Sequence, residues 1–377
     1  MGLPKSCAWK PEARYPKGTH NRITDVPGVR VGQVTLTDDA RDVHTGVTAI
    51  LPHGGNLFRY KVMAGCCVIN GFGKSVGLIQ VEELGTMESP IVMTNTLSVG
   101  TALTASVRYM LARCPEIGVT TGTVNCVVTE CNDGSLNDIR GLHVREEDVL
   151  EAICSAGEDF AEGSVGAGTG MICMGLKGGI GSASRVLEYD GRSYVLGALV
   201  LSNFGSAGHL RIGGRRAVPP KDDETASEKT PSQIPPGEAS AYAKEPKEKI
   251  PNAKDDPAME ADRGSVIIVI ATDLPLSDRQ LKRTARRAVI GLGRVGSYIG
   301  NGSGDIAIAF STGNMVPHES ESAVLAARML RDSAMDRVFE ATAEAVEEAV
   351  LSSLWHASPM TGIRGRSVRS LRECSVE

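Results

Sequence analysis

A Gly-Ser pair marks the point where a long polar stretch gives way to a strongly apolar run. Gly264 and Ser265 are followed by residues 266–270, all of them valine or isoleucine. The Ser265 hydroxyl can attack the Gly264 carbonyl and shift the chain from amide to ester, which water would hydrolyse to leave a new N-terminal serine. Glycine suits the upstream position because it tolerates strained backbone angles and leaves the carbonyl uncovered. Without further context, the same residues are also typical of a linker that leads into a strand.

A second candidate for this chemistry lies before the next apolar run. Residues 301–305 read Asn-Gly-Ser-Gly-Asp and precede residues 306–310. Ser303 and Asp305 are two apart, so they share one side of an extended segment. A hydroxyl and a carboxylate on one face can relay a proton and orient a neighbouring nucleophile. As an isolated motif, the segment is also typical of a turn.

Two further polar side chains have both a catalytic and a structural interpretation. Glu130 begins the sequence Glu-Cys-Asn-Asp-Gly over residues 130–134, which is typical of a turn but also offers a carboxylate to a cationic substrate group. Asn203 follows the apolar run 194–201. Its amide can donate a hydrogen bond to an oxyanion, or it can cap the turn at the end of a strand.

Three glycine-rich stretches invite a nucleotide-binding interpretation, and each fails on spacing. Residues 71–75 end as a P-loop does but have Val68 where the first glycine is required. Residues 165–170 and 175–182 match neither the P-loop nor the dinucleotide template. We instead expect these loops to bring backbone N–H groups close to a ligand or to another strand.

The composition is that of a globular enzyme and excludes several other classes. Hydrophobic residues make up 41% and charged residues 23% of the 377-residue chain. The formal net charge of -5 argues against a nucleic-acid or anionic-membrane surface, and no apolar stretch approaches the ~20 residues that span a bilayer. The 9 cysteines lack C-x-x-C spacing and the 7 histidines are dispersed. We therefore expect reduced thiols, a cytoplasmic protein and no metal site.

Hydrophobic patterning predicts the elements that must position these residues. Clusters of β-branched residues predict strands, and apolar residues at helical spacing predict helices. Up to about residue 213, the predicted strands are 29–36, 45–51 and 194–201, and the predicted helices are 101–114 and 146–160. After Ser265, the order is strand 266–271, a helix that starts at Ser277-Asp278 and continues through residues 281–299, strand 306–310 and helix 334–355. This alternation of strands and helices indicates strands that join one sheet with helices packed outside it, which is a layered α/β architecture.

A change of composition separates the two parts. From about residue 214 to residue 263, prolines alternate with lysine, glutamate, aspartate and serine. Such a segment buries too little apolar surface to offset its ordering entropy, so we predict a mobile linker. So long a linker is unusual within a compact domain, but it is compatible with a chain that is cut at its end.

Taken in order, these motifs resemble those of a known family. The L-aminopeptidase/D-esterase-amidase family (the DmpA type), which includes the β-peptidyl aminopeptidases, is similar over nearly the whole chain outside the linker. The segments that carry the resemblance are residues 23–32, 129–134, 136–138, 168–171, 177–181, 203–205, 264–265 and 302–305. The resemblance implies a four-layer αββα sandwich, similar to that of N-terminal-nucleophile hydrolases but with different strand connectivity. It also implies a precursor that cuts itself into residues 1–264 and 265–377, which remain together as one catalytic domain.

The resemblance also implies roles for individual residues. Ser265 would be the nucleophile, supported by Ser303 and Asp305. Asn203 would help to hold the oxyanion, and Glu130 would bind the free amine of the substrate. A further substrate-site position is Asn132, which falls where some family members have a tyrosine near the active centre.

The sequence therefore predicts a self-processing serine aminopeptidase or amidase-esterase. Its substrates would be small peptides, amino-acid amides or esters with an unblocked amino end, without a metal or organic cofactor. The resemblance favours a homo-oligomer of cleaved heterodimers, and the net charge argues against nucleic-acid and membrane partners. Two alternatives remain at this point. One is an acyltransferase of ornithine acetyltransferase-like architecture, whose usual Ala-Thr-Met context differs from Gly264-Ser265-Val266. The other is a non-cleaved binding protein on the same fold.

Overall fold

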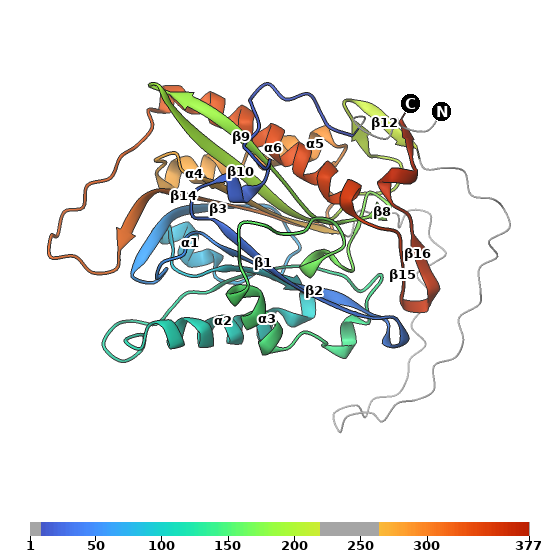
Figure 1. Ribbon diagram of the computed structural model, residues 1–377, viewed down its shortest axis with the longest axis horizontal. Coiled ribbons are helices and arrows are strands. Elements are labelled where there is room, and N and C mark those ends of the chain that lie inside the picture. Colours follow the sequence, from blue (N-terminus) through green and yellow to red (C-terminus); the bar gives the residue numbers. More distant parts are fainter. Residues whose placement is uncertain (1–8, 219–263, 377) are drawn as a thin grey trace.

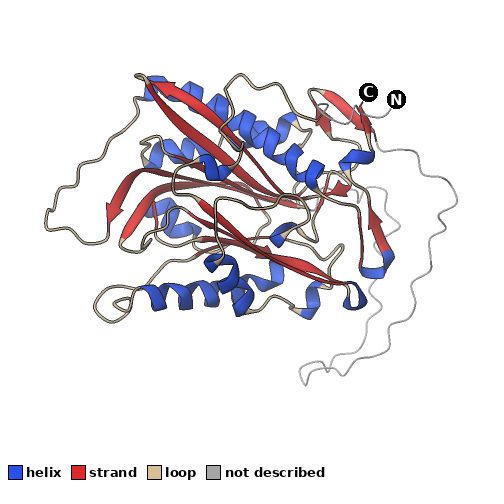
Figure 2. Cartoon of the chain, viewed as in Figure 1, coloured by secondary structure: helices blue, strands red, loops and turns tan. Residues whose placement is uncertain are grey.

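A computed structural model describes residues 9–218 and 264–376, which form four stacked layers (Figure 1). Two β-sheets lie face to face in the middle, and helices cover the outer face of each sheet (Figure 2). The αββα arrangement that the sequence implied is therefore confirmed.

The smaller sheet has four strands and the larger sheet has six. The smaller one has the order β1 (Arg30–Asp38), β2 (Val43–Leu51), β5 (Ile91–Asn95) and β6 (Val127–Cys131). The larger one has the order β4 (Thr86–Met87), β3 (Tyr60–Gly71), β14 (Gly304–Pro317), β13 (Ser265–Thr272), β10 (Arg192–Asn203) and β9 (Gly179–Tyr189). Strands β13 and β14 are parallel, whereas β13 and β10 are antiparallel.

The helices divide between the two outer layers (Figure 1). Those over the smaller sheet are α2 (Val99–Arg113) and α3 (Glu146–Cys154), and those over the larger sheet are α4 (Asp278–Ala285), α5 (Ala288–Arg294) and α6 (Met335–His356). Helix α1 (Leu78–Leu84) packs against β3. The short strands are β7 (Ile172–Cys173), β8 (Leu176–Lys177), β11 (Arg211–Ile212), β12 (Arg215–Val218), β15 (Met360–Gly362), β16 (Arg366–Val368) and β17 (Ser375–Val376).

Three aliphatic cores hold the layers together. Side chains from both sheets, such as Ile50 and Ile267, meet in the space between the sheets. The other cores lie under the two helical layers. Helix α6 approaches β9 so closely that a Cβ added at Gly181 would lie 2.0 Å from the Ala349 carbonyl oxygen, so this strand position accepts no side chain.

Most of the predicted elements are confirmed, and two helix boundaries are wrong. Helix α3 ends at Cys154, well short of Phe160, because Gly157 forms a β-bridge with Val31 and draws the chain out of the helix. Phe160 then packs in the core between the sheets. The helix predicted over residues 281–299 is in fact two helices, and it stops before Gly296, whose φ of +98° a right-handed helix does not allow.

The first residues of the predicted linker form a strand. Residues 215–218 form β12, which pairs with β17 near the C-terminal end. Residues 219–263 lie outside the described part of the chain.

A buried ion-pair cluster joins β9 to α6. Arg185 is fully buried, and its Nε and Nη2 donate to Glu344 and Glu348 at 3.0 Å and 2.9 Å. Glu348 also accepts from Lys17 at 2.5 Å. Removing the guanidinium would leave two carboxylates buried with much of their compensating charge gone.

We expect Arg185→Leu to lower the free energy of unfolding by about 3–5 kcal/mol, measured by denaturant unfolding at fixed protein concentration. The matched control is Arg14→Leu, which removes a solvent-exposed pair with Glu340 on the same helix. This control should leave the free energy of unfolding close to that of the wild type, because the pair is exposed to solvent. Equal losses in the two variants would contradict the structural role given to the buried cluster.

Candidate active site

Strand β13 brings three of the predicted segments together at one end of the larger sheet. Ser265, the first residue of β13, lies opposite Asn203 at the end of β10 and beside Gly304 at the start of β14. Gly304 is flanked in sequence by Ser303 and Asp305. The strand register therefore brings the backbones of Ser265, Asn203 and residues 303–305 together at one end of the sheet, where Ser265 is only 4% exposed.

The Ser303–Asp305 pair is formed and buried. The Ser303 hydroxyl donates to Asp305 Oδ1 at 2.6 Å, and both residues are buried. The Asn70 side-chain amide donates to the carbonyls of Gly300 and Asn301 at 3.1 Å each, and to the carbonyl of Ser303. Asn70 thereby holds the turn that carries the pair.

The side-chain amide of Asn203 has a fixed orientation. The Ile172 N–H donates to Asn203 Oδ1 at 2.9 Å, and Asn203 Nδ2 donates to the Asn132 carbonyl at 3.0 Å. These two contacts distinguish the oxygen of the amide from its nitrogen. The bond to Asn132 uses one of the two hydrogens on Nδ2.

A buried lysine holds the loop that supplies the Ile172 N–H. Lys177 Nζ donates to the carbonyls of Gly168, Met171 and Gly178 at 3.1, 2.9 and 2.8 Å. Burial lowers the pKa of Lys177 to about 7, while nearby Asp133 opposes that shift. Only an ammonium has three hydrogens to donate, so the contacts favour the charged form of Lys177.

Glu130 lies across from the nucleophile segment, at the end of β6 in the smaller sheet. Its Oε1 accepts from the Lys74 backbone N–H at 2.8 Å, and its Oε2 accepts from the Thr96 hydroxyl. Glu130 is 3% exposed. A carboxylate so enclosed, with no cation as its hydrogen-bond partner in these two contacts, is suited to a cationic ligand.

The two remaining predicted positions contribute through their backbones. The Gly264 carbonyl accepts from the Gly304 N–H at 3.1 Å, and a Cβ added at Gly264 would lie 2.0 Å from the Asn203 carbonyl oxygen. The side chain of Asn132 is exposed and its Oδ1 accepts from the Gly134 N–H at 2.9 Å, which closes a turn. Asn132 thus supports Asn203 through its carbonyl, and its own amide is engaged locally.

A cysteine thiol lies between the two groups of polar residues. Burial raises the pKa of Cys131 well above its usual value, Glu130 raises it further, and hydrogen bonding with Ser265 opposes the rise. The Cys131 thiol therefore stays protonated near neutral pH. It does not compete with Ser265 as a nucleophile.

Sequence reasoning gave no site role to Asn70, Thr96 or Lys177. The glycine-rich stretch 71–75 was expected to bring a backbone N–H close to a ligand or strand, and the Lys74 N–H does approach Glu130. A lysine inside the glycine-rich run 175–182 was the available signal for Lys177, because a charged side chain among small residues is often enclosed by backbone. Asn70 and Thr96 carry no such signal.

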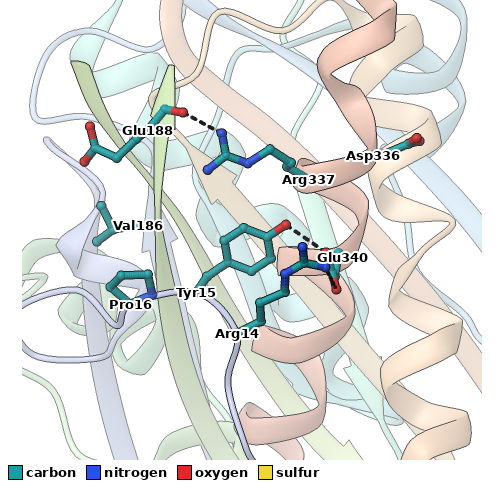
Figure 3. Close-up of a pocket in the computed structure, with 8 residues that line it drawn as sticks. All are labelled: Arg14, Tyr15, Pro16, Val186, Glu188, Asp336, Arg337 and Glu340. Atoms are coloured by element: carbon teal, nitrogen blue, oxygen red, sulfur yellow. Dashed lines mark hydrogen bonds and ion pairs between the residues drawn. The ribbon is translucent and has the colours of Figure 1, made fainter. Parts of the chain in front are cut away.

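A surface cavity of about 590 Å³ lies away from these residues (Figure 3). It is lined by Arg14, Tyr15, Pro16, Val186, Glu188, Asp336, Arg337 and Glu340. Val186 pairs with Val195, about 25 Å along β10 from Asn203 at roughly 3.3 Å per residue. Tyr15 donates to Glu340 at 2.8 Å and Arg337 donates to the Glu188 carbonyl at 2.7 Å, so these lining groups satisfy one another.

A serine at the head of a central strand, beside a hydroxyl–carboxylate pair and a fixed amide in an αββα sandwich, defines a hydrolase of the N-terminal-nucleophile type. Residues 21–368 match the model of Peptidase family S58. The chain belongs to that family, as the resemblance in its motifs implied.

Relatives of known structure or activity agree with this assignment. The β-peptidyl aminopeptidase BapA of Sphingosinicella microcystinivorans is 39% identical over 363 residues, which cover 94% of this chain and 86% of BapA. The PH0078 protein from Pyrococcus horikoshii OT3 has 46% sequence identity and a TM-score of 0.82, with 97% of this chain and 94% of that chain covered. The L-aminopeptidase D-Ala-esterase/amidase from Ochrobactrum anthropi, described as a prototype for the serine aminopeptidases with a variant of the Ntn hydrolase fold, has 37% identity and a TM-score of 0.79, with 96% and 94% covered. The protein is a serine aminopeptidase.

No helix within residues 9–218 and 264–376 is long and apolar enough to cross a membrane. In the same ranges, no group of three or more His, Cys, Asp or Glu side chains could hold a metal ion.

We expect Lys177→Met to lower kcat for an aminoacyl p-nitroanilide on the order of 10²-fold, because a loosened loop misplaces the Ile172 N–H and with it the Asn203 amide. KM should change much less, since Glu130 is held by other segments. The control is Lys282→Met, which removes a partly exposed lysine paired with Glu82. A Lys177→Met enzyme that is folded by circular dichroism and keeps the wild-type kcat would contradict this assignment.

Proposed function

We propose that the chain cuts its own backbone between Gly264 and Ser265 and then uses the new N-terminal Ser265 as the nucleophile of an aminopeptidase. The observation that carries this proposal is the register of β13, which sets Ser265 between Asn203 and Gly304. The matched family and the named relatives are peptidases, which favours hydrolysis over acyl transfer and over non-catalytic binding.

In the cleavage step, Ser265 Oγ bonds to the Gly264 carbonyl carbon. The C–N bond breaks and the hydroxyl proton passes to the departing amine. Water then hydrolyses the ester to a Gly264 carboxylate and a Ser265 with a free α-amine. The Gly304 N–H supports attack because it already donates to the Gly264 carbonyl oxygen at 3.1 Å and draws electron density from the carbon. The absence of a Cβ at Gly264 keeps that carbonyl close to the strand ends.

In turnover, the freed amine of Ser265 takes the proton from its own hydroxyl, since an α-amine has a reference pKa of about 8. Ser265 Oγ attacks the substrate carbonyl, the leaving amine takes the proton, and water hydrolyses the resulting ester. The second hydrogen of Asn203 Nδ2 is the proposed donor to the oxyanion. The Ser303–Asp305 pair, joined at 2.6 Å, orients the nucleophile and relays protons.

Glu130 is the proposed receptor for the substrate ammonium. Its carboxylate is buried, and both groups that donate to it, the Lys74 N–H and the Thr96 hydroxyl, are neutral. A substrate with a blocked amine would leave this carboxylate without a counter-charge, and that loss costs more than the contact itself gains. The site therefore selects the free amino end of a peptide.

The proposed substrates are small peptides, amino-acid amides and esters with a free amino group. β-Aminoacyl compounds belong in the first screen because the relatives that are 39% and 37% identical are named β-peptidyl aminopeptidases. We also propose a homo-oligomer of cleaved heterodimers in the cytoplasm, in keeping with the free thiols of the described cysteines.

The cleavage proposal predicts two fragments in the purified protein. Intact mass of the wild type should give residues 1–264 and 265–377, whose masses sum to the 39.7 kDa precursor plus one water. Ser265→Ala should remain whole, because no hydroxyl is available for the shift. Ser106→Ala, which removes another buried serine hydroxyl on α2, is the control and should be cut as the wild type is. A whole wild type, or a cut Ser265→Ala, would refute the proposal.

The amine-binding proposal predicts a loss of discrimination in Glu130→Gln. This variant keeps the shape of the side chain but removes its charge. We expect kcat/KM for unblocked aminoacyl p-nitroanilides to fall on the order of 10²-fold, which corresponds to a loss of about 3 kcal/mol of transition-state stabilisation. The kcat/KM for N-acetylated substrates should change little. Glu116→Gln removes a surface carboxylate paired with Arg59 and serves as the control. If Glu130→Gln keeps the wild-type preference for unblocked substrates, Glu130 does not bind the amine.

A further inference from the structure

The segment after β3 runs between the two ends of the proposed substrate site. A Cβ added at Gly73 would lie 3.6 Å from Glu130 Oε1 and 3.7 Å from the Cα of Gly304. Gly304 is the residue that pairs with Ser265. Gly73 therefore lies between the carboxylate proposed to hold the substrate amine and the strand end that carries the nucleophile.

This position fixes where the first residue of a substrate must lie. In the proposed function, the ammonium of that substrate residue contacts Glu130 and its carbonyl carbon contacts Ser265. The substrate atoms between the ammonium and the carbonyl therefore pass along residues 72–74. The backbone of Phe72 and Gly73 is packed against Gly304, where an added Cβ would lie 2.9 Å from Gly73 N and 3.1 Å from the Phe72 carbonyl carbon. The backbone of this segment therefore has no room to withdraw toward the sheet.

Each of the two segments that bind Glu130 carries an exposed apolar side chain. Phe72 is 62% exposed, and it precedes Gly73 and the Lys74 N–H that binds Glu130. Leu97 is 51% exposed, and it follows the Thr96 hydroxyl that binds the other carboxylate oxygen. Exposed apolar side chains on the two segments that bind a buried carboxylate are accounted for if an apolar group of the substrate covers them.

A positive charge stands beside the same surface. Lys74 Nζ lies 4.4 Å from the centroid of the Phe72 ring and donates to the Phe72 carbonyl at 3.0 Å. No carboxylate is among these contacts. An ammonium over the ring attracts the π-face and repels a second cation that approaches it.

We propose that Phe72, Leu97 and Lys74 determine which N-terminal residue the enzyme removes. Phe72 and Leu97 contact apolar and aromatic side chains of that residue, and the Lys74 ammonium rejects lysine and arginine. The preferred substrates are therefore peptides, amides or esters that begin with a neutral apolar residue. This inference rests on the proposed function, since it takes Glu130 and Ser265 as the two ends of the site.

The rejection of basic residues is tested with norleucyl and lysyl p-nitroanilides, prepared in α- and β-amino acid series. The two side chains have the same length and differ in the terminal ammonium. Wild type should favour norleucyl at least ten-fold in kcat/KM. Lys74→Glu should raise relative kcat/KM for lysyl about ten-fold, and this gain should shrink in high salt because both charges are exposed to solvent. Since the backbone N–H is retained, the bond to Glu130 is kept in the variant.

The apolar contact is tested with phenylalanyl and alanyl p-nitroanilides. Phe72→Ala should lower the phenylalanyl-to-alanyl ratio of kcat/KM about ten-fold, within the range known for lost apolar contacts in a binding site. Leu84→Ala is the matched control, because Leu84 is also 62% exposed but lies at the end of α1. The control should leave the ratio as in the wild type.

The outcomes separate this inference from the function on which it rests. A wild type that is cut and hydrolyses alanyl p-nitroanilide, but prefers lysyl over norleucyl or keeps its ratio in Phe72→Ala, overturns the specificity inference alone. A wild type without activity on any unblocked substrate overturns the proposed function and this inference together. The specificity inference and the proposed function are both supported if Lys74→Glu raises the lysyl-to-norleucyl ratio, Phe72→Ala lowers the phenylalanyl-to-alanyl ratio, and Leu84→Ala changes neither.

Discussion

The hydrogen-bonded register of β13 is the constraint on which the rest of the site depends. A strand can pair with its neighbours in one register only if its buried side chains stay on the core face, and β13 is buried along its full length between β10 and β14. A slip of one residue would turn Ser265 to the opposite face and move it away from Asn203 and Gly304. The same apolar side chains that fill the core therefore also set the position of the Ser265 hydroxyl, the proposed nucleophile.

Around this register, polar groups are held by backbone atoms more than by other side chains. The Lys177 ammonium binds three carbonyls, the Asn70 amide binds the turn before β14, and Glu130 receives a backbone N–H. Backbone partners move only if the chain moves, so the donors and acceptors are oriented before any substrate arrives. A preorganised site of this kind requires little reorganisation when charge develops on a substrate carbonyl.

The sequence predicts the strands and long helices well because their apolar periodicity is local. The sequence also identifies four candidate site residues from their position beside an apolar run. Ser265, Ser303 and Asp305 lie before such a run, and Asn203 lies after one. The prediction fails at Phe160, where a β-bridge between Gly157 and Val31 ends a helix that local spacing would continue. The supporting contacts of Asn70 and Thr96 could not be predicted, because they join residues 233 and 34 positions apart and no pattern near either partner reports the contact.

The order of strands in the larger sheet gives the chain an unusual tolerance of a broken backbone. Strands β13 and β14 stand between β10 and β3, which precede residue 219. Helix α6, from the C-terminal part, packs on β9 and β10 from the N-terminal part. A cut before Ser265 therefore removes one covalent link but leaves every sheet hydrogen bond and both faces of the core in place. The parts of the chain on either side of Ser265 interleave in the larger sheet and share its core, so the fragments of the proposed cut would stay together while folded.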